Sequence, residues 1–99
     1  MKTVSGGIEF DWDAGNVRHL KIHRVTPSEF EELMIGDPDY LEYQAEGDEE
    51  IEERYKVLGA TKAARVLIGV WTPRDGKVWA VTAYDAGPVY RDLYWGTRR

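Results

Sequence analysis

An uninterrupted apolar run at residues 65–72 (RVLIGVWT) places the tightest constraint on the fold of this chain. A strand that is apolar at nearly every position suits the interior of a sheet, covered on both faces, better than an edge. The run is also far shorter than a bilayer-spanning segment. Residues 73–76 (PRDG) are expected to form a turn, because proline presets φ and glycine permits a positive φ. Residues 77–84 then return as an antiparallel partner strand.

The first quarter of the chain carries a strand signal followed by a helix signal. Ile8, Phe10 and Trp12 alternate with acidic residues, which is the period of a half-buried strand. Asp13 occupies the position of a helix N-cap. We therefore expect a short strand and then a helix over residues 14–23.

A second helix has the clearest start signal in the chain. Thr26 is its expected N-cap, Pro27 its first residue, and Glu29 the reciprocal member of a capping box. Gly36, followed by an Asp-Pro pair, ends it.

The remaining patterns complete an α+β domain. A short edge strand is expected at residues 40–43, a further strand at 54–58, and a last helix from Gly87-Pro88 to about Gly96. The predicted order is an N-terminal strand, two helices, an antiparallel meander of about four strands and a C-terminal helix. A chain of 99 residues accommodates this as a single domain over residues 1–99.

The net charge of −5 is unevenly distributed. Nine acidic residues and no basic residue lie between Asp37 and Glu53, whereas the rest of the chain carries all 13 basic residues against 9 acidic ones. This acidic segment is either a solvated loop or a docking surface for a basic partner, and both interpretations stay open. The absence of cysteine excludes disulfides and thiolate chemistry. Because residues 1–10 lack the apolar core of a signal peptide, we expect a cytoplasmic protein without membrane association.

Both histidines lie on the first predicted helix, four residues apart. His19 and His23 are accompanied there by Arg18, Lys21 and Arg24. Such a cluster could bind phosphate and transfer protons, since imidazole is suited to general acid–base work near neutral pH. A solvated basic helix face is the alternative. A zinc site is least favoured, because no HExxH pattern and no cysteine supports it, and neither a metal nor a cofactor is predicted.

Cationic and aromatic residues on the predicted strands offer further candidates. Arg54 and Arg65 could form a bidentate clamp on phosphate, or could instead pair with the acidic segment. Aromatic side chains could stack on nucleobases, although aromatics on strands and amphipathic helices usually belong to the core. Those considered are Trp71, Trp79, Tyr84, Tyr90, Tyr94 and Trp95.

Three segments, taken in order, resemble the BrnT family of type II toxins in the RelE/ParE-like superfamily. They are FDWD at 10–13, EERYKVLGAT at 52–61 with ARVLIGVWT at 64–72, and VTAYDA at 81–86 ahead of a terminal helix. They are similar to the family patterns F-E/D-W-D … N … K-H-G-V, E-R-Y-x-x-x-G-x-T … R-x-L-x-V-V-Y-T, and I-S-A-R-x-A … E-x-x-x-Y. The resemblance spans residues 8–95 and implies a RelE-like small domain.

The resemblance implies a ribonuclease toxin that cleaves RNA without a metal and so inhibits translation. Its partners would be RNA and a BrnA-like ribbon-helix-helix antitoxin, with a heterotetramer containing an antitoxin dimer as one assembly. Carried over by position, the implied catalytic residues are His23, Lys21, Arg54 and Arg65, and the implied substrate-binding residues are His19, Arg18 and Arg91.

Three positions depart from the family patterns. The family's K-H-G reads Ile22-His23-Arg24 here, the arginine of its G-R-T is Ala60, and the arginine of its I-S-A-R is Tyr84. Two strand cations are therefore missing, and each charge-assisted contact contributes about 1.5–3 kcal/mol. The alternative hypothesis is a catalytically inactive BrnT-like binding module that acts through a protein partner.

Overall fold

The computed structural model describes the backbone of residues 1–46 and 52–98, and the side chains of residues 1–41 and 53–98. Within these ranges the chain forms three helices and one six-stranded sheet. The elements are β1 (Lys2–Ser5), β2 (Ile8–Asp11), α1 (Ala14–Ile22), α2 (Pro27–Ile35), β3 (Asp39–Glu46), β4 (Glu52–Ala60), β5 (Val66–Arg74), β6 (Lys77–Asp85) and α3 (Gly87–Gly96). The predicted α+β class and order of elements are confirmed.

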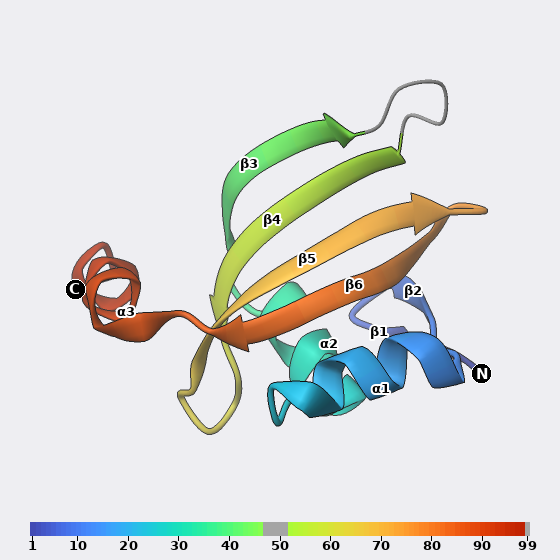
Figure 1. Ribbon diagram of the computed structural model, residues 1–99. Helices are drawn as coiled ribbons and strands as arrows, with labels where there is room; N and C mark the ends of the chain where they lie inside the picture. The colour runs from blue at the N-terminus through green and yellow to red at the C-terminus, as the bar shows by residue number, and fades with distance from the viewer. Residues whose placement is uncertain (47–51, 99) are drawn as a thin grey trace.

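The sheet has the strand order β1-β2-β6-β5-β4-β3 (Figure 1). Strands β3 to β6 form the predicted antiparallel meander, with β3 at one edge and β5 in the interior. Strand β2, which corresponds to the predicted N-terminal strand, joins the sheet parallel to β6 and pairs with it at Val78 and Trp79. Helix α1 lies along the remainder of β6, so its C-terminal end reaches the end of that strand (Figure 1).

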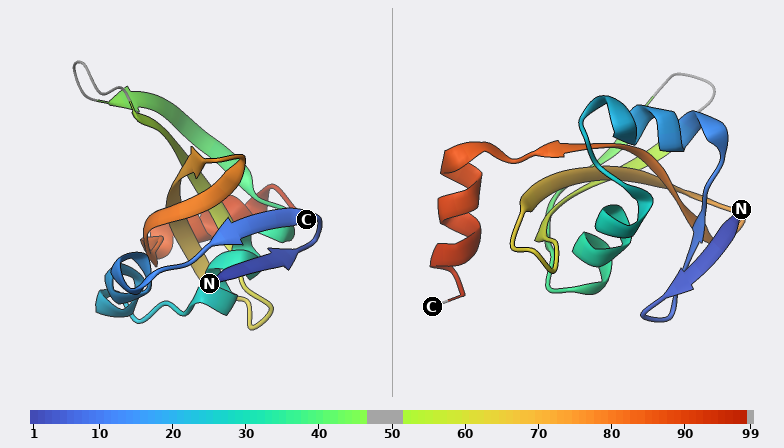
Figure 2. Two further views of the ribbon diagram at one scale, coloured as in Figure 1. Left: turned by 90° about the vertical axis from the view of Figure 1, so that its right-hand side faces the viewer. Right: turned by 90° about the horizontal axis from the view of Figure 1, so that it is seen from below.

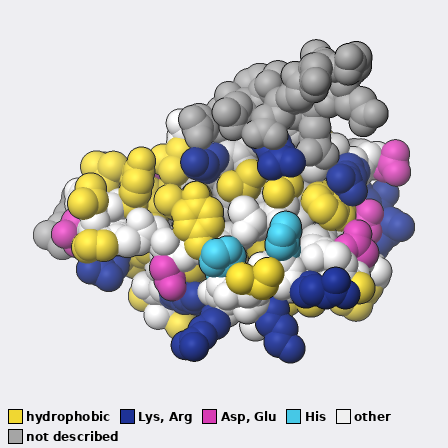
Figure 3. Space-filling view, viewed as in Figure 1, with side chains coloured by type: hydrophobic (Ala, Val, Ile, Leu, Met, Phe, Trp, Pro, Cys, Tyr) yellow, Lys and Arg dark blue, Asp and Glu magenta, His cyan; other side chains and the backbone are white. Residues whose placement is uncertain are grey.

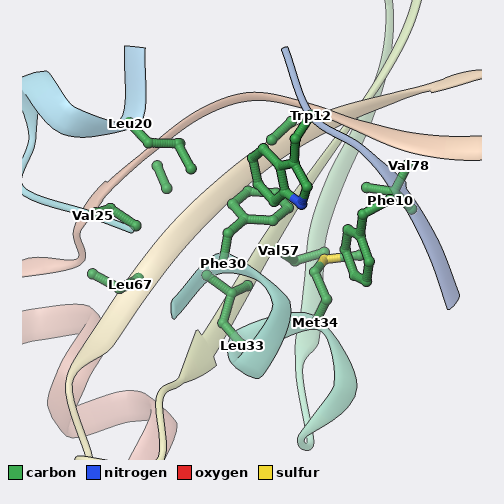
Figure 4. Close-up of a cluster of buried hydrophobic side chains, with 12 residues drawn as sticks. Phe10, Trp12, Leu20, Val25, Phe30, Leu33, Met34, Val57, Leu67 and Val78 are labelled. Atoms are coloured by element: carbon green, nitrogen blue, oxygen red, sulfur yellow. The ribbon is translucent and has the colours of Figure 1, made fainter. Parts of the chain in front are cut away.

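Side chains of β5 alternate between two apolar clusters, one on each face of the sheet. Leu67 points into the larger cluster, which we call the main core and which Figure 4 shows. The main core also contains Leu20 of α1 and Phe30 of α2. Val66 and Ile68 point to the opposite face, where they pack with residues of α3. We call this second group the α3 cluster; it contains buried Leu58, Val66, Ile68 and Tyr94. The prediction that this strand is covered on both faces is therefore confirmed.

Two strand glycines allow α2 to approach the sheet closely. A Cβ atom at Gly59 would lie 2.7 Å from the carbonyl oxygen of Leu33. A Cβ atom at Gly69 would lie 3.1 Å from the ring of Phe30. Any larger residue at Gly59 would push the helix backbone away from the sheet.

The first hairpin was not predicted from the sequence, because only its second strand carries an alternating pattern. β1 pairs with β2 and is held to α2 by the carboxylate of Glu31. That carboxylate accepts hydrogen bonds from Thr3 Oγ1 at 2.5 Å, Ser5 Oγ at 2.5 Å and Trp12 Nε1 at 2.8 Å. Burial raises the pKa of Glu31, but these three hydrogen bonds outweigh it and leave the pKa below its usual value.

The turn between β5 and β6 lies within the predicted residues 73–76, at the C-terminal end of that range. Pro73 and Arg74 continue β5, and the turn itself consists of Asp75 at φ 52° and Gly76 at φ 74°. Two successive residues with positive φ form a type I′ turn, whose twist matches that of the flanking strands. Asp-Gly is a preferred pair for this turn, and the positive φ expected at Gly76 is confirmed.

Candidate functional site

The aromatic-acidic lead-in at residues 10–13 serves the architecture. The rings of Phe10 and Trp12 stack in the main core with centroids 6.3 Å apart. Asp13 is the predicted N-cap of α1, accepting from the backbone N–H of Asn16 at 2.8 Å and from Trp79 Nε1 at 3.0 Å. The bond from Trp79 and those from backbone N–H groups lower the pKa of the Asp13 carboxyl. Asn16 is fully buried and completes a capping box.

Helix α1 ends in a Schellman motif that presents His23 to solvent. The N–H of Arg24 donates to the carbonyl of Lys21 at 2.9 Å, and the N–H of Val25 donates to that of Leu20 at 3.0 Å. His23 is the C-cap and is exposed, whereas Val25 is buried in the main core. Arg24 has φ 57°, in the position that usually holds glycine.

Arg65 binds this helix end and the end of β6 at the same time. Its Nε donates to Asp85 Oδ1 at 3.0 Å, and its Nη2 donates to Asp85 Oδ2 at 3.3 Å and to the carbonyl of His23 at 3.2 Å. Its Nη1 donates to the carbonyl of Arg24 at 2.6 Å and to the Glu29 carboxylate at 3.2 Å. A guanidinium has five N–H groups, and these five hydrogen bonds engage all of them.

The electrostatics of Arg65 agree with this arrangement. Hydrogen bonds to Asp85 raise the pKa of its guanidinium, and those to Glu29 add to the effect, while partial burial opposes it. The side chain of Arg65 is 27% exposed and that of Glu29 is 26% exposed. The guanidinium therefore has a structural position, and a phosphate could bind it only by displacing one of these acceptors.

His23 lies beside Tyr84 of β6. Their ring centroids are 6.0 Å apart, with the ring planes tilted by 58°. Arg65 explains the approach, because it bonds the carbonyl of His23 and the carboxylate of Asp85, the residue after Tyr84. Tyr84 is half-buried and packs against the α3 cluster. Among the described residues, its hydroxyl has no hydrogen-bond partner.

The remaining sequence candidates on α1 are exposed. Arg18, His19 and Lys21 all reach solvent. Within the described part of the chain, neither imidazole takes part in a hydrogen bond or ion pair. Figure 3 shows the two histidines next to each other on one face, among hydrophobic side chains and with Lys and Arg side chains above and below. The structure thus brings the two imidazoles together on one face and places the ring of Tyr84 beside His23.

The other candidates lie apart from this group. Arg54 is partly buried on β4, where it has interactions of its own. Arg91 is exposed on α3, which stands at one end of the sheet (Figure 2). Across the described residues, no three His, Asp or Glu side chains gather where they could hold a metal ion. None of the helices in those ranges has the length and apolar character needed to cross a bilayer.

Most of the acidic segment between Asp37 and Glu53 lies outside the described side chains. At its start, Asp37 and Asp39 accept from the guanidinium of Arg98 at 3.1 and 3.0 Å. That guanidinium also lies 3.6 Å from the ring centroid of Tyr94. These two carboxylates therefore fasten the end of the chain after α3.

Comparison with protein families decides the identity. The family model described as "Ribonuclease toxin, BrnT, of type II toxin-antitoxin system" matches residues 12–88. The chain belongs to the BrnT family. Searches of curated proteins and of solved structures gave no match.

Membership in the BrnT family makes this chain a ribonuclease toxin of a type II toxin–antitoxin system, which implies a protein antitoxin as partner. The matched region contains the histidine pair, Arg54, Arg65 and Tyr84, but it ends before Arg91. Sequence reasoning identified the histidines as candidates. It missed the contact between His23 and Tyr84 and the internal engagement of Arg65, because no local pattern signals either one.

Proposed function

We propose that this BrnT protein cleaves RNA without a metal ion and that His23 is the general base. The observation that carries the proposal is the geometry at the end of α1. His23 has a solvent-exposed imidazole, while its own carbonyl is bound by Arg65 at 3.2 Å. A reactive group held on a fixed backbone can be presented to substrate at little entropic cost.

In this proposal His23 accepts the proton of an RNA 2′-hydroxyl as that oxygen attacks the adjacent phosphorus. The O2′–P bond forms and the P–O5′ bond breaks, leaving a 2′,3′-cyclic phosphate and a 5′-hydroxyl. His19 in its protonated form gives a proton to the departing O5′. Side chains four apart on a helix are neighbours, which supports joint action of the two imidazoles on one phosphate.

The cations on α1 are assigned to charge stabilisation. Lys21 and Arg18 offset the negative charge that develops on the phosphorane oxygens. Arg54 and Arg91 extend the binding of the RNA backbone away from the cleaved bond. Arg65 acts indirectly, as a positioning residue, because every one of its donors is engaged within the protein.

We further propose that cleavage inhibits translation in the cytoplasm and that a ribbon-helix-helix antitoxin neutralises the toxin. A heterotetramer with an antitoxin dimer is the proposed assembly. Exposed His19 and His23 offer a surface that an antitoxin could cover, and covering them would block the reaction directly.

Induced expression in bacterial cells tests this function. The wild-type protein should arrest growth and cleave cellular RNA, and His23→Ala should abolish both effects. Ile22→Ala removes a neighbouring side chain that is 67% exposed and should remain toxic, which makes it the matched control. A His23→Ala protein as toxic as wild type would overturn the catalytic assignment. A harmless wild-type protein that still captures its antitoxin would support the inactive binding module instead.

A further inference from the structure

We propose that Tyr84 forms a subsite for one unpaired nucleobase, next to the phosphate handled by His23. This inference rests on the proposed function, since it concerns the same RNA. It assigns a ligand to a half-buried aromatic side chain of β6 that lies beside His23.

The ring of Tyr84 is supported on the side that faces the α3 cluster. Tyr84 pairs with Ile68 across β6 and β5, and it packs against the α3 cluster, whose members Leu58 and Ile68 are 1% and 5% exposed. Helix α2 packs on the other side of the sheet, against the main core. The ring is therefore held in place on one side and remains half-buried, with surface left for a ligand.

Tyr94 in the same cluster shows what a purely structural tyrosine looks like here. It is 3% exposed, and its hydroxyl donates to the carbonyl of Asp37 at 2.9 Å. Tyr84 differs in both respects, because it is half-buried and its hydroxyl has no partner in the described part of the chain. Among the described residues the Tyr84 hydroxyl is not a buried atom lacking a partner, so this side chain is open to solvent where Tyr94 is enclosed.

The surroundings of Tyr84 select a nucleotide over other ligands with flat rings. The His23 ring lies 6.0 Å away and is exposed. A nucleotide carries a base and a phosphate on one sugar, so it can place its base on Tyr84 and its phosphate near His23. Stacking of unpaired bases on sheet aromatics is a common mode of RNA recognition and tolerates all bases.

Binding of short RNA to the full-length protein tests the subsite, with a 2′-deoxy nucleotide at the cleaved position to prevent turnover. Tyr84→Phe should bind within about twofold of wild type, because the ring is retained. Tyr84→Leu should weaken binding by about 5- to 150-fold, the range that stacking of one base supplies. Tyr84→Trp should bind as tightly as wild type or more tightly.

The second arm replaces single nucleotides of the RNA by abasic ones. At one position, base removal should weaken wild-type binding as much as Tyr84→Leu does, and it should have little further effect on the Tyr84→Leu protein. Additive losses at every position would overturn the subsite. The abasic series on wild type and the Phe and Trp variants decide the matter even where Tyr84→Leu fails to fold.

The outcomes separate this inference from the proposed function. RNA that binds with the Tyr84 dependence but is never cleaved supports the subsite and contradicts the nuclease. Cleavage that depends on His23 but not on Tyr84 supports the nuclease and overturns the subsite. A wild-type protein that neither binds nor cleaves RNA overturns both.

Discussion

The backbone of Arg24 is strained at the end of α1. Its φ of 57° lies in the left-handed region, which costs an L-residue about 1–2 kcal/mol relative to its preferred regions. Glycine has no such penalty, so Arg24→Gly should raise the free energy of unfolding by about 1 kcal/mol despite the entropy that glycine adds to the unfolded chain. Denaturant unfolding measures the change. An unchanged or lower stability would mean that the arginine side chain contributes contacts that outweigh the strain.

Arg65 has two candidate roles, as a direct phosphate ligand or as a residue that positions His23, and substitution distinguishes them. A lysine keeps the charge but cannot form the five-donor network. We expect Arg65→Lys to reduce stability by about 1–3 kcal/mol, to lower kcat for RNA cleavage and to shift the backbone NMR resonances of His23 and Arg24. Lys62→Arg, the reverse exchange on an exposed side chain that has no proposed role in RNA binding, is the control and should change none of these. A higher KM at unchanged stability would instead identify Arg65 as a direct phosphate ligand.

Among the elements, the β1–β2 hairpin depends on one carboxylate in α2. The pKa of Glu31 lies below its usual value of 4.5, so its ionised form stabilises the fold above that pH. This contribution is lost as the pH falls through the folded-state pKa. Glu31→Gln should cost about 1–3 kcal/mol at neutral pH and should make the loss of stability on acidification shallower. Thermal melts between pH 7 and about pH 3 measure both effects.

Glu9→Gln is the matched control for this carboxylate. Glu9 is exposed on β2, and among the described residues its carboxylate has a single ion pair, with Lys77 at 3.9 Å. Its removal should change stability by less than about 0.5 kcal/mol. Equal effects of the two substitutions would show that the hydrogen bonds to Glu31 do not hold the hairpin.

Elements with strong local signals could be predicted, and those held by distant contacts could not. The cap residues Asp13 and Thr26 fixed both helix starts, and the apolar run of β5 identified an interior strand. β1 has no such signal, because what holds it is Glu31, 28 residues away from Thr3. The turn after β5 also carries a local signal, because Gly76 has the positive φ that its place in the predicted turn requires.

At the scale of the whole molecule, the candidate site lies where the end of α1 meets the end of β6. The sequence could place His19 and His23 together, because four residues make one helical turn. It could not show that His23 meets Tyr84 or that Arg65 bonds a carbonyl 42 residues away. Such contacts follow from the way that α1 lies along the sheet. The assignment of Arg65 to phosphate binding was a natural prediction from a strand arginine, and the structure supplies a reason to prefer positioning.

Metal-independent catalysis by His23 is tested most directly by cleavage of end-labelled RNA by purified protein in the presence of a metal chelator. We predict that the wild-type protein forms products ending in 2′,3′-cyclic phosphate and 5′-hydroxyl, and that His23→Ala slows their formation about 10²- to 10⁴-fold. Cleavage at the wild-type rate by His23→Ala, or activity that appears only when a divalent metal is restored, would contradict this prediction.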